Sequence, residues 1–311
     1  MPKGKNYKKL IEDLTFILDP PDPSYRCMSC KDCHDCKFPN DSANMTSKQH
    51  MEEYMLRKSV RYDSEKGCFV AALPLLKDPE KFLASNEAEA KRRYQRTVQK
   101  LDKEPENKKL LMKQFEKLVK LGYIEKLEDM SEETQSLING KKKNYIAWQV
   151  VTKSTSVSTP CRQVFDVSAK TKTGLSINNI LCKGKPMLDL DPPLLSFIHQ
   201  KHALAVDFQK FYNSCKLDPN HYHLQCIMWS DDLSPNKDPS TYIIKTLTYG
   251  LVSSSRQLEL CAEIMAESNK SEVDFYNLIK KYRYVDDCLL SMKSKACIDN
   301  LIVKADNILS K

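Results

Sequence analysis

Several signatures that identify common enzyme classes are missing from this 311-residue sequence. It contains only 7 glycines, and neither glycine-rich phosphate-binding pattern, G-x-G-x-x-G or G-x-x-x-x-G-K-[ST], occurs. No apolar run approaches the length of a membrane span. Charged residues at 8, 9, 12 and 13 interrupt the segment in which a secretory signal would place its apolar core. The usual nucleotide-binding loops are therefore excluded, and we expect an intracellular, cytoplasmic protein without a membrane span.

The composition indicates a folded protein and favours one class of binding partner. The chain is 41% hydrophobic and 29% charged, which is typical of a folded protein with one large domain or two ordinary ones. Lysine and arginine number 49 against 41 acidic residues, for a net charge of +8. A positive balance of this size favours polyanionic partners such as nucleic acids. The 12 cysteines are expected to be reduced thiols, because no secretory signal is present.

Four cysteines recur at every third position, Cys27, Cys30, Cys33 and Cys36. Zinc sites usually take two C-x-x-C pairs from separate turns, so four thiolates this close could hold one zinc ion only with strain. Ferredoxin-type iron–sulfur runs need a distant fourth ligand and a following proline. A zinc site and an exposed patch of reduced thiols are the two alternatives. A metal-binding interaction module centred on these cysteines is a separate hypothesis for the whole protein.

The hydrophobic pattern predicts a mixed α+β fold in three consecutive segments. Residues 1–63 are polar and are expected to form an irregular leader with little core, followed by regions at 64–200 and 201–311. Helices are expected at 86–101, 107–121, 192–200, 254–268 and 295–309. Strands are expected at 144–152, 161–167, 202–207 and 242–247, and on both sides of the adjacent aspartates at 286 and 287.

These aspartates, Asp286 and Asp287, are the most informative feature of the sequence. They lie between β-forming residues in the string KKYRYVDDCLLSM, where adjacent carboxylates repel each other unless a cation compensates them. Mg²⁺ prefers such oxygen ligands, and Asp207, at the end of the apolar strand ALAVD, is the candidate for a third. Three acids could hold two Mg²⁺ ions for nucleotidyl transfer. This hypothesis requires the strand ending at residue 207 to lie beside the 286–287 turn; the alternative for an isolated pair is a solvated turn.

The string YVDD at 284–287 resembles the Y-x-D-D motif of reverse transcriptases. Four blocks in order resemble the Bel/Pao class of long-terminal-repeat retrotransposons, and they are CRQVFDVSAKTKTGLSINNIL (161–181), ALAVDFQKFYNSCKLDPNHYHLQCIMW (203–229), TLTYGLVSSS (246–255) and YVDD. The match is most convincing from residue 144 onward. It implies the fingers (64–200) and the antiparallel palm sheet with packed helices (201–311) of a right-hand polymerase, with the thumb missing. The function implied is that of a reverse transcriptase, an RNA-directed DNA polymerase, in part of a retroelement polyprotein. The alternative is a truncated remnant without catalysis that at most binds nucleic acid.

The resemblance also implies roles for charged residues. Asp207, Asp286 and Asp287 match the catalytic acids that bind two Mg²⁺ ions. Arg162 matches a fingers residue that contacts the incoming deoxynucleoside triphosphate, and a guanidinium suits this role because it binds phosphate oxygens in a planar, bidentate manner. Lys153 is a second candidate cation. The partners expected are a primer annealed to an RNA or DNA template, and deoxynucleoside triphosphates.

Aromatic and small residues complete the predicted site. Tyr212 matches the ring that lies under the sugar and leaves no room for a 2′-hydroxyl, and Phe211 is the competing choice. Tyr249 and Gly250 match a turn under the templating base pair, where glycine allows close approach of the backbone. The sequence departs from relatives at two positions: Tyr249 replaces a glutamine, and Ser255 stands where a proline is common.

Overall fold

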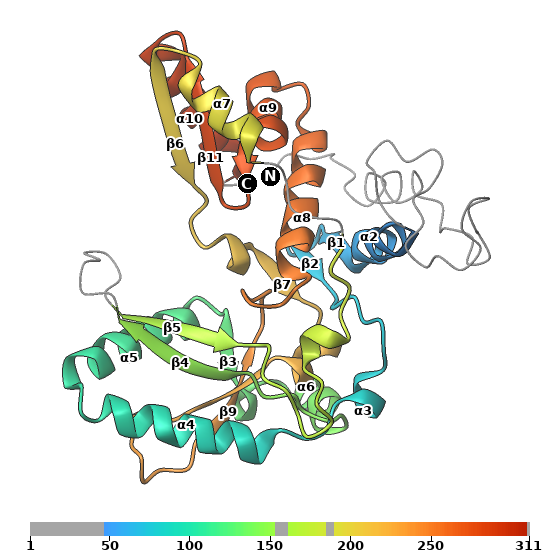
Figure 1. Ribbon diagram of the computed structural model, residues 1–311, viewed down its shortest axis with the longest axis vertical. Coiled ribbons are helices and arrows are strands. Elements are labelled where there is room, and N and C mark those ends of the chain that lie inside the picture. The colour runs from blue at the N-terminus through green and yellow to red at the C-terminus, as the bar shows by residue number, and fades with distance from the viewer. Residues whose placement is uncertain (1–46, 153–160, 185–189, 310–311) are drawn as a thin grey trace. The chain divides into compact units, whose positions relative to one another are not determined.

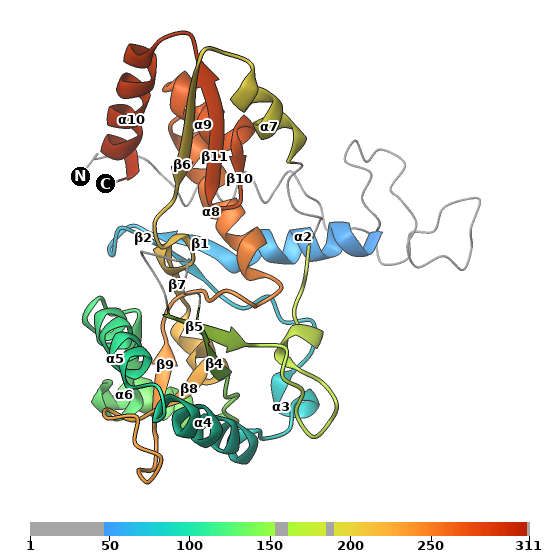
Figure 2. The ribbon, with the colours of Figure 1, turned by 60° about the vertical axis from the view of Figure 1, so that its left-hand side comes forward.

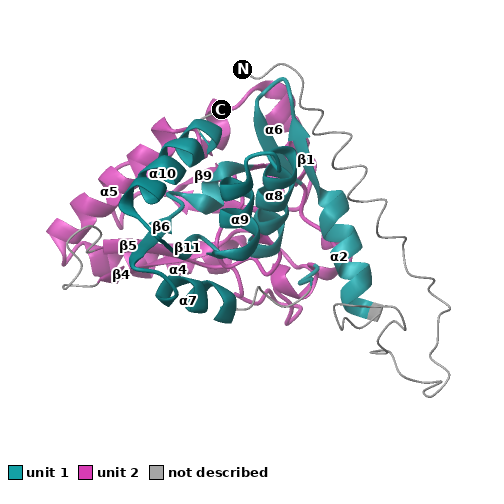
Figure 3. Ribbon diagram, turned by 90° about the horizontal axis from the view of Figure 1, so that it is seen from above, with its two compact units in different colours: residues 1–71, 182–215, 255–311 teal, residues 72–181, 216–254 magenta. Residues whose placement is uncertain are grey.

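The computed structural model describes residues 47–152, 161–184 and 190–309 (Figure 1). These residues form two compact units, each assembled from separate stretches of the chain (Figure 3). Unit 1 contains the described parts of 1–71, 182–215 and 255–311, and unit 2 contains those of 72–181 and 216–254. The units therefore do not coincide with the three consecutive segments expected from the sequence. The division into leader, fingers and palm stays a prediction.

Unit 1 is built around a three-stranded antiparallel sheet with the strand order β10-β11-β6. Its elements are α2 (Ser47–Ser59), β1 (Val60–Asp63), β2 (Cys68–Ala71), α7 (Asp191–Ile198), β6 (His202–Asp207), the 3₁₀ turn η3 (Phe211–Ser214), α8 (Ser254–Ser268), α9 (Val273–Lys281), β10 (Arg283–Tyr284), β11 (Asp287–Met292) and α10 (Lys295–Leu309). Strand β7 (Cys215–Leu217) leads from this unit into unit 2.

Alternation of side chains gives the central sheet one buried face. Cys288 and Leu290 of β11 are fully buried, and Leu204 and Val206 of β6 pack against the same core. That core is completed by α8, α9 and α10, with Phe275 of α9 fully buried at its centre. Figure 2 shows α9 and α10 beside the strands of this sheet. The intervening residues of both strands consequently project from the opposite face, where Ser291 donates to the Ser196 carbonyl of α7 and where Asp207 and Asp287 are exposed.

Unit 2 contains a two-stranded hairpin, β4-β5, and a three-stranded antiparallel sheet in the order β3-β9-β8. Its elements are α3 (Pro79–Phe82), α4 (Glu87–Leu101), α5 (Pro105–Lys120), β3 (Ile124–Lys126), η1 (Leu127–Asp129), α6 (Glu132–Asn139), β4 (Ala147–Thr152), β5 (Cys161–Asp166), η2 (Ile177–Asn179), η4 (Pro219–Leu224), β8 (Cys226–Trp229) and β9 (Ser240–Ile244). Aromatic rings fill its core: Phe115 of α5 stacks on Trp229 with ring centroids 3.7 Å apart, and Trp148 lies 5.2 Å from the same ring.

The α+β class with antiparallel sheets is confirmed. The helix predicted at 254–268 is α8, and the one predicted at 86–101 is α4. The strands predicted at 144–152 and 161–167 correspond to the antiparallel pair β4 and β5. No helix within the described ranges is both long enough and apolar enough to cross a membrane. The expectation of little core in the first 63 residues is wrong for 47–63, because this stretch forms α2 and β1 and buries Leu56 and Val60 completely.

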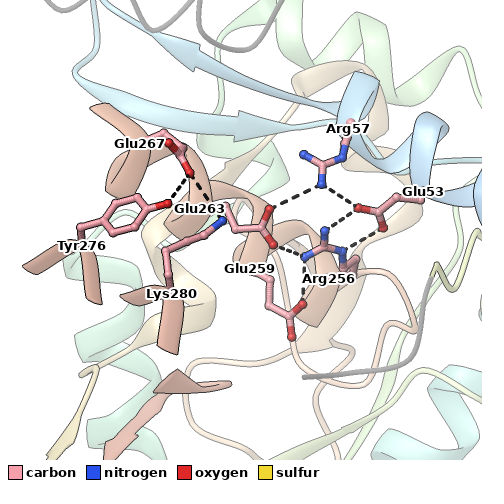
Figure 4. A network of polar contacts seen from close by, with 8 residues as sticks. All are labelled: Glu53, Arg57, Arg256, Glu259, Glu263, Glu267, Tyr276 and Lys280. Atoms are coloured by element: carbon pink, nitrogen blue, oxygen red, sulfur yellow. Dashed lines mark hydrogen bonds and ion pairs between the residues drawn. The ribbon is translucent and has the colours of Figure 1, made fainter. Parts of the chain in front are cut away.

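Helix α2 docks in unit 1 through charge, which explains why a hydrophobic pattern did not reveal it. The Arg256 side chain on α8 is 3% exposed, and its guanidinium donates to both carboxylate oxygens of Glu53 on α2 (Figure 4). It also donates to Glu259 at 3.0 Å and Glu263 at 2.7 Å. Burial alone would lower the pKa of Arg256, but Glu53 and Glu263 outweigh that effect and raise it. Arg57 of α2 extends the network to Glu263 at 3.5 Å.

We expect Arg256→Met to destabilise unit 1 strongly. The substitution leaves Glu259 buried without its counter-charge and Glu53 with Arg57 alone, at 3.2 Å, which costs about 3–5 kcal/mol of the free energy of unfolding. Urea denaturation followed by circular dichroism measures this loss. The control Lys304→Met removes a half-exposed ion pair with Glu272 at 3.8 Å and should change stability by less than about 1 kcal/mol. Equal effects of the two substitutions would contradict the central position of Arg256.

Candidate active site

The structure brings the predicted acids to one end of the unit 1 sheet. Asp207 is the last residue of β6, Asp287 is the first of β11, and the two are direct partners in the antiparallel register. Directly opposite residues project from the same face of a sheet, with Cβ atoms about 4.5–5.5 Å apart. Both side chains are exposed, and Asp286 occupies the adjoining turn between β10 and β11. The strand that ends at residue 207 therefore lies beside the 286–287 turn, as the metal hypothesis requires.

Like charges meet at this sheet end without compensation. Among the described residues, no cation forms an ion pair with Asp207, Asp286 or Asp287. Burial, and then the charges of Asp286 and Asp207, raise the pKa of Asp287. Opposed like charges destabilise a sheet, so the arrangement costs stability unless a cation binds.

The three aspartates have the oxygen ligands that a hard divalent cation prefers, although they do not form a ready metal site in the described structure. Carboxylate oxygens are the ligands that Mg²⁺ takes in proteins, and a bound cation would relieve the repulsion that raises the pKa of Asp287. In the part of the chain that the structure describes, no three His, Cys, Asp or Glu side chains are grouped as a ready metal site. The acids thus fit Mg²⁺ by their chemistry and by their place at one sheet end.

The turn that carries the acids has an unusual backbone. Val285 has a φ of 57°, in the left-handed region that a β-branched residue rarely adopts and that glycine normally occupies in such turns. Strain of this kind costs on the order of 1–3 kcal/mol and collects at functional sites. Both carbonyl groups of the turn are held: Arg283 donates to Val285 O at 2.8 Å, and the Phe208 amide donates to Asp286 O at 2.8 Å. The second contact ties the turn to the residue that follows Asp207.

Two aromatic rings follow strand β6 in η3, and they have different surroundings. The Tyr212 hydroxyl forms a hydrogen bond of 2.8 Å with the Ser255 hydroxyl in the first turn of α8. The Phe211 ring instead packs against Phe208, with centroids 6.0 Å apart, and under the guanidinium of Arg283. The Phe211 and Tyr212 rings also pack edge to face, with centroids 6.2 Å apart. The choice of Tyr212 over Phe211 as the ring under the sugar stays a prediction.

The other predicted site residues that the structure describes belong to unit 2. The exposed side chain of Arg162 lies on β5, next to Gln163, whose carbonyl oxygen accepts a 2.5 Å hydrogen bond from the Tyr249 hydroxyl. Gly250 has a φ of 94°, and a Cβ there would lie 2.9 Å from Val167 Cγ2. Glycine is therefore required at this position on both grounds. The structure thus places Tyr249 and Gly250 against residues 163–167, in the segment whose strand β5 carries Arg162.

Some predicted residues lie outside the described ranges, and some residues of the site were not predicted. Lys153 and the four cysteines Cys27, Cys30, Cys33 and Cys36 fall outside the described residues. No role was assigned to Arg283 in the sequence analysis. None was assigned to Ser255 either, whose hydroxyl bonds to that of Tyr212. A charged residue inside a run of β-forming residues was the available signal for Arg283, because such a position is usually apolar.

Comparisons with known proteins give a weak structural likeness. No family model and no curated protein matches the sequence. Among solved structures, the native prototype foamy virus protease-reverse transcriptase aligns over 63% of this chain and 21% of its own, with 18% identity and a TM-score of 0.41. A foamy viral protease-reverse transcriptase in complex with double-stranded DNA aligns over 65% and 28%, with 15% identity and a TM-score of 0.40. The chain spans about a quarter of these proteins, and likeness at this level assigns it neither a family nor an activity.

We expect Asp207→Asn to lower the pKa of Asp287 in metal-free buffer. The substitution removes a negative charge directly opposite Asp287, so proton release from Asp287 becomes easier and its pKa moves down toward the ordinary value of 3.8. A carboxyl-detected NMR titration measures the change. The control Asp299→Asn, on the exposed side of α10, should leave the titration of Asp287 unchanged. An unaltered pKa in the Asp207 variant would show that the two carboxylates are not neighbours.

Proposed function

We propose that the chain carries the fingers and palm of an RNA-directed DNA polymerase, a reverse transcriptase of a Bel/Pao-type retroelement polyprotein. The observation that carries this proposal is the direct pairing of Asp207 with Asp287 beside Asp286 at one sheet end, without a compensating cation among the described residues. An acidic cluster that costs stability is expected where chemistry needs it. The four sequence blocks give the class of chemistry, which is nucleotidyl transfer from a deoxynucleoside triphosphate to a primer paired with an RNA or DNA template.

In this proposal, each type of side chain at the site would have a separate role in nucleotidyl transfer. Asp207, Asp286 and Asp287 would hold two Mg²⁺ ions, which when bound supply Lewis-acid stabilisation of the charge on the triphosphate and on the primer hydroxyl. Arg162 would hold the triphosphate, since its guanidinium keeps a fixed charge and offers bidentate contacts. The Tyr212 ring would occupy the space of a 2′-hydroxyl and so select deoxynucleotides by shape.

A second candidate is a protein that binds nucleic acid but performs no synthesis. One observation favours it: the carboxylate side chains are not gathered around a common point in the described part of the chain. The net charge of +8 suits nucleic-acid binding in either case. The two candidates differ in whether a primer is extended, so one assay separates them.

Primer extension on a homopolymer RNA template with Mg²⁺ should depend on the acids. Asp286→Asn removes one charge and one metal ligand, so we expect a loss of at least about 100-fold in extension rate, the scale of losing one electrostatic stabiliser. The matched control Asp299→Asn should extend at the rate of the parent. Chelation with EDTA should abolish extension, and added Mg²⁺ should restore it. Equal background from the parent and Asp286→Asn, with template still bound, would favour the non-catalytic candidate.

Tyr212→Ala should weaken the preference for deoxynucleotides over ribonucleotides. Loss of the ring opens the space of the 2′-hydroxyl, so the ratio of the kcat/KM values should fall on the order of 10- to 100-fold. Single-nucleotide incorporation with dTTP and UTP measures it. Tyr212→Phe keeps the ring and should keep the preference. If Phe211→Ala lowers the ratio and Tyr212→Ala does not, the role belongs to Phe211.

A further inference from the structure

Arg283 places a buried guanidinium behind the turn that carries Asp286 and Asp287. It is 3% exposed and lies directly opposite Cys288, which is fully buried, in the β10-β11 pairing. Partners in a register share a face, so the Arg283 side chain projects toward the core. The neighbouring pair, Tyr284 and Asp287, projects from the other face. Arg283 therefore supports the turn from the side opposite to the Asp287 carboxylate.

This guanidinium holds a backbone that would otherwise relax. Val285 sits at a φ of 57°, and its carbonyl oxygen accepts from Arg283 Nη1 at 2.8 Å. A valine gains free energy by returning to a negative φ, which would rotate the following peptide and turn the Asp286 side chain to a new direction. A charged donor bound to the Val285 carbonyl opposes this rotation, because hydrogen bonds to charged groups are the stronger ones.

Residues outside the turn keep Arg283 in place. Its guanidinium lies over the Phe211 ring, 6.0 Å from the centroid. Burial lowers the pKa of Arg283, and the charge of Glu259 on α8 opposes that effect. The Glu259 side chain is 1% exposed and accepts from Arg256 at 3.0 Å. The charge of Glu259 therefore favours the charged form of Arg283 from a distance, while the guanidinium itself is held by the Val285 carbonyl and the Phe211 ring.

We infer that Arg283 is a positioning residue for nucleotidyl transfer: by holding the Val285 carbonyl it maintains the left-handed turn that sets the direction of Asp286 relative to Asp207 and Asp287. The inference rests on the proposed function and goes beyond it, because Arg283 faces the core and contacts neither acid directly. It assigns the strain at Val285 to the function of the site.

The test combines Arg283→Gln with Val285→Gly in single and double variants of the full chain. Arg283→Gln should lower kcat for dTTP incorporation by at least about 10-fold and leave its KM within about 3-fold, because the acids lose their direction and the nucleotide keeps its other contacts. Glycine adopts a positive φ without strain. The double variant should therefore recover a large part of the kcat that Arg283→Gln loses, and Val285→Gly alone serves as its reference.

The matched control is Arg256→Gln, assayed well below the unfolding temperature of every variant. It removes another buried guanidinium of the same network, and the only hydrogen bonds recorded for it in the described structure go to glutamates. Its kcat should not be rescued by Val285→Gly. Rescue of both arginine variants, or of neither, would overturn the positioning role and leave the proposed function intact.

A readout without catalysis separates this inference from the proposed function. Amide hydrogen exchange of residues 284–288 should be at least about 10-fold faster in Arg283→Gln than in the parent, with exchange in β6 unchanged. If the parent fails to extend a primer, the proposed function fails, and faster exchange still supports Arg283 as the holder of the turn. Unchanged exchange overturns the holding contact whatever the activity.

Discussion

Two aspartates placed directly opposite each other on antiparallel strands are the constraint on which the rest of unit 1 depends. Asp207 and Asp287 repel at close range, and a sheet selected for stability alone would pair apolar, hydroxyl or oppositely charged side chains there. The opposite face offsets this cost. Leu204, Val206 and Leu290 pack there against α9 and α10. A slip of the register by one residue would expose these side chains and bury the acids, so the packing that stabilises the sheet also fixes the site.

The charges of unit 1 are divided between two faces of the same sheet. On the core side, Arg256 and Arg283 are both buried. Arg256 forms ion pairs there with Glu53, Glu259 and Glu263. On the exposed side, the three aspartates have no counter-charge among the described residues. Arg283 donates to Val285 O and lies over the Phe211 ring, and the charge of Glu259 opposes part of the effect of its burial, so none of these contacts draws on the aspartates. The protein thereby keeps the negative charge of the site available.

The sequence allowed most elements to be predicted but not their assembly. Helix α8 and the strand ending at Asp207 follow from hydrophobic periodicity, and the acidic turn follows from two aspartates between β-forming runs. The face on which Asp287 meets Asp207 depends on register, which a single strand does not encode. Helix α2 was missed because its buried side chains include Glu52 and Glu53 beside Leu56, and hydrophobic periodicity detects apolar residues only. The left-handed φ of Val285 could not be predicted, since propensity argues against it.

The serine at position 255 stands where the family that the sequence resembles commonly has proline, and either residue is compatible with the same architecture. Proline is tolerated in the first turn of a helix because the amide it lacks has no partner within the helix, and Ser255 is the second residue of α8. Exchanging one residue for the other therefore leaves the start of α8 intact. What changes is the hydroxyl, which in this chain bonds to Tyr212 at 2.8 Å, a contact that proline cannot make. A serine at this position consequently adds a hydrogen-bonded restraint on the Tyr212 ring that proline would not supply.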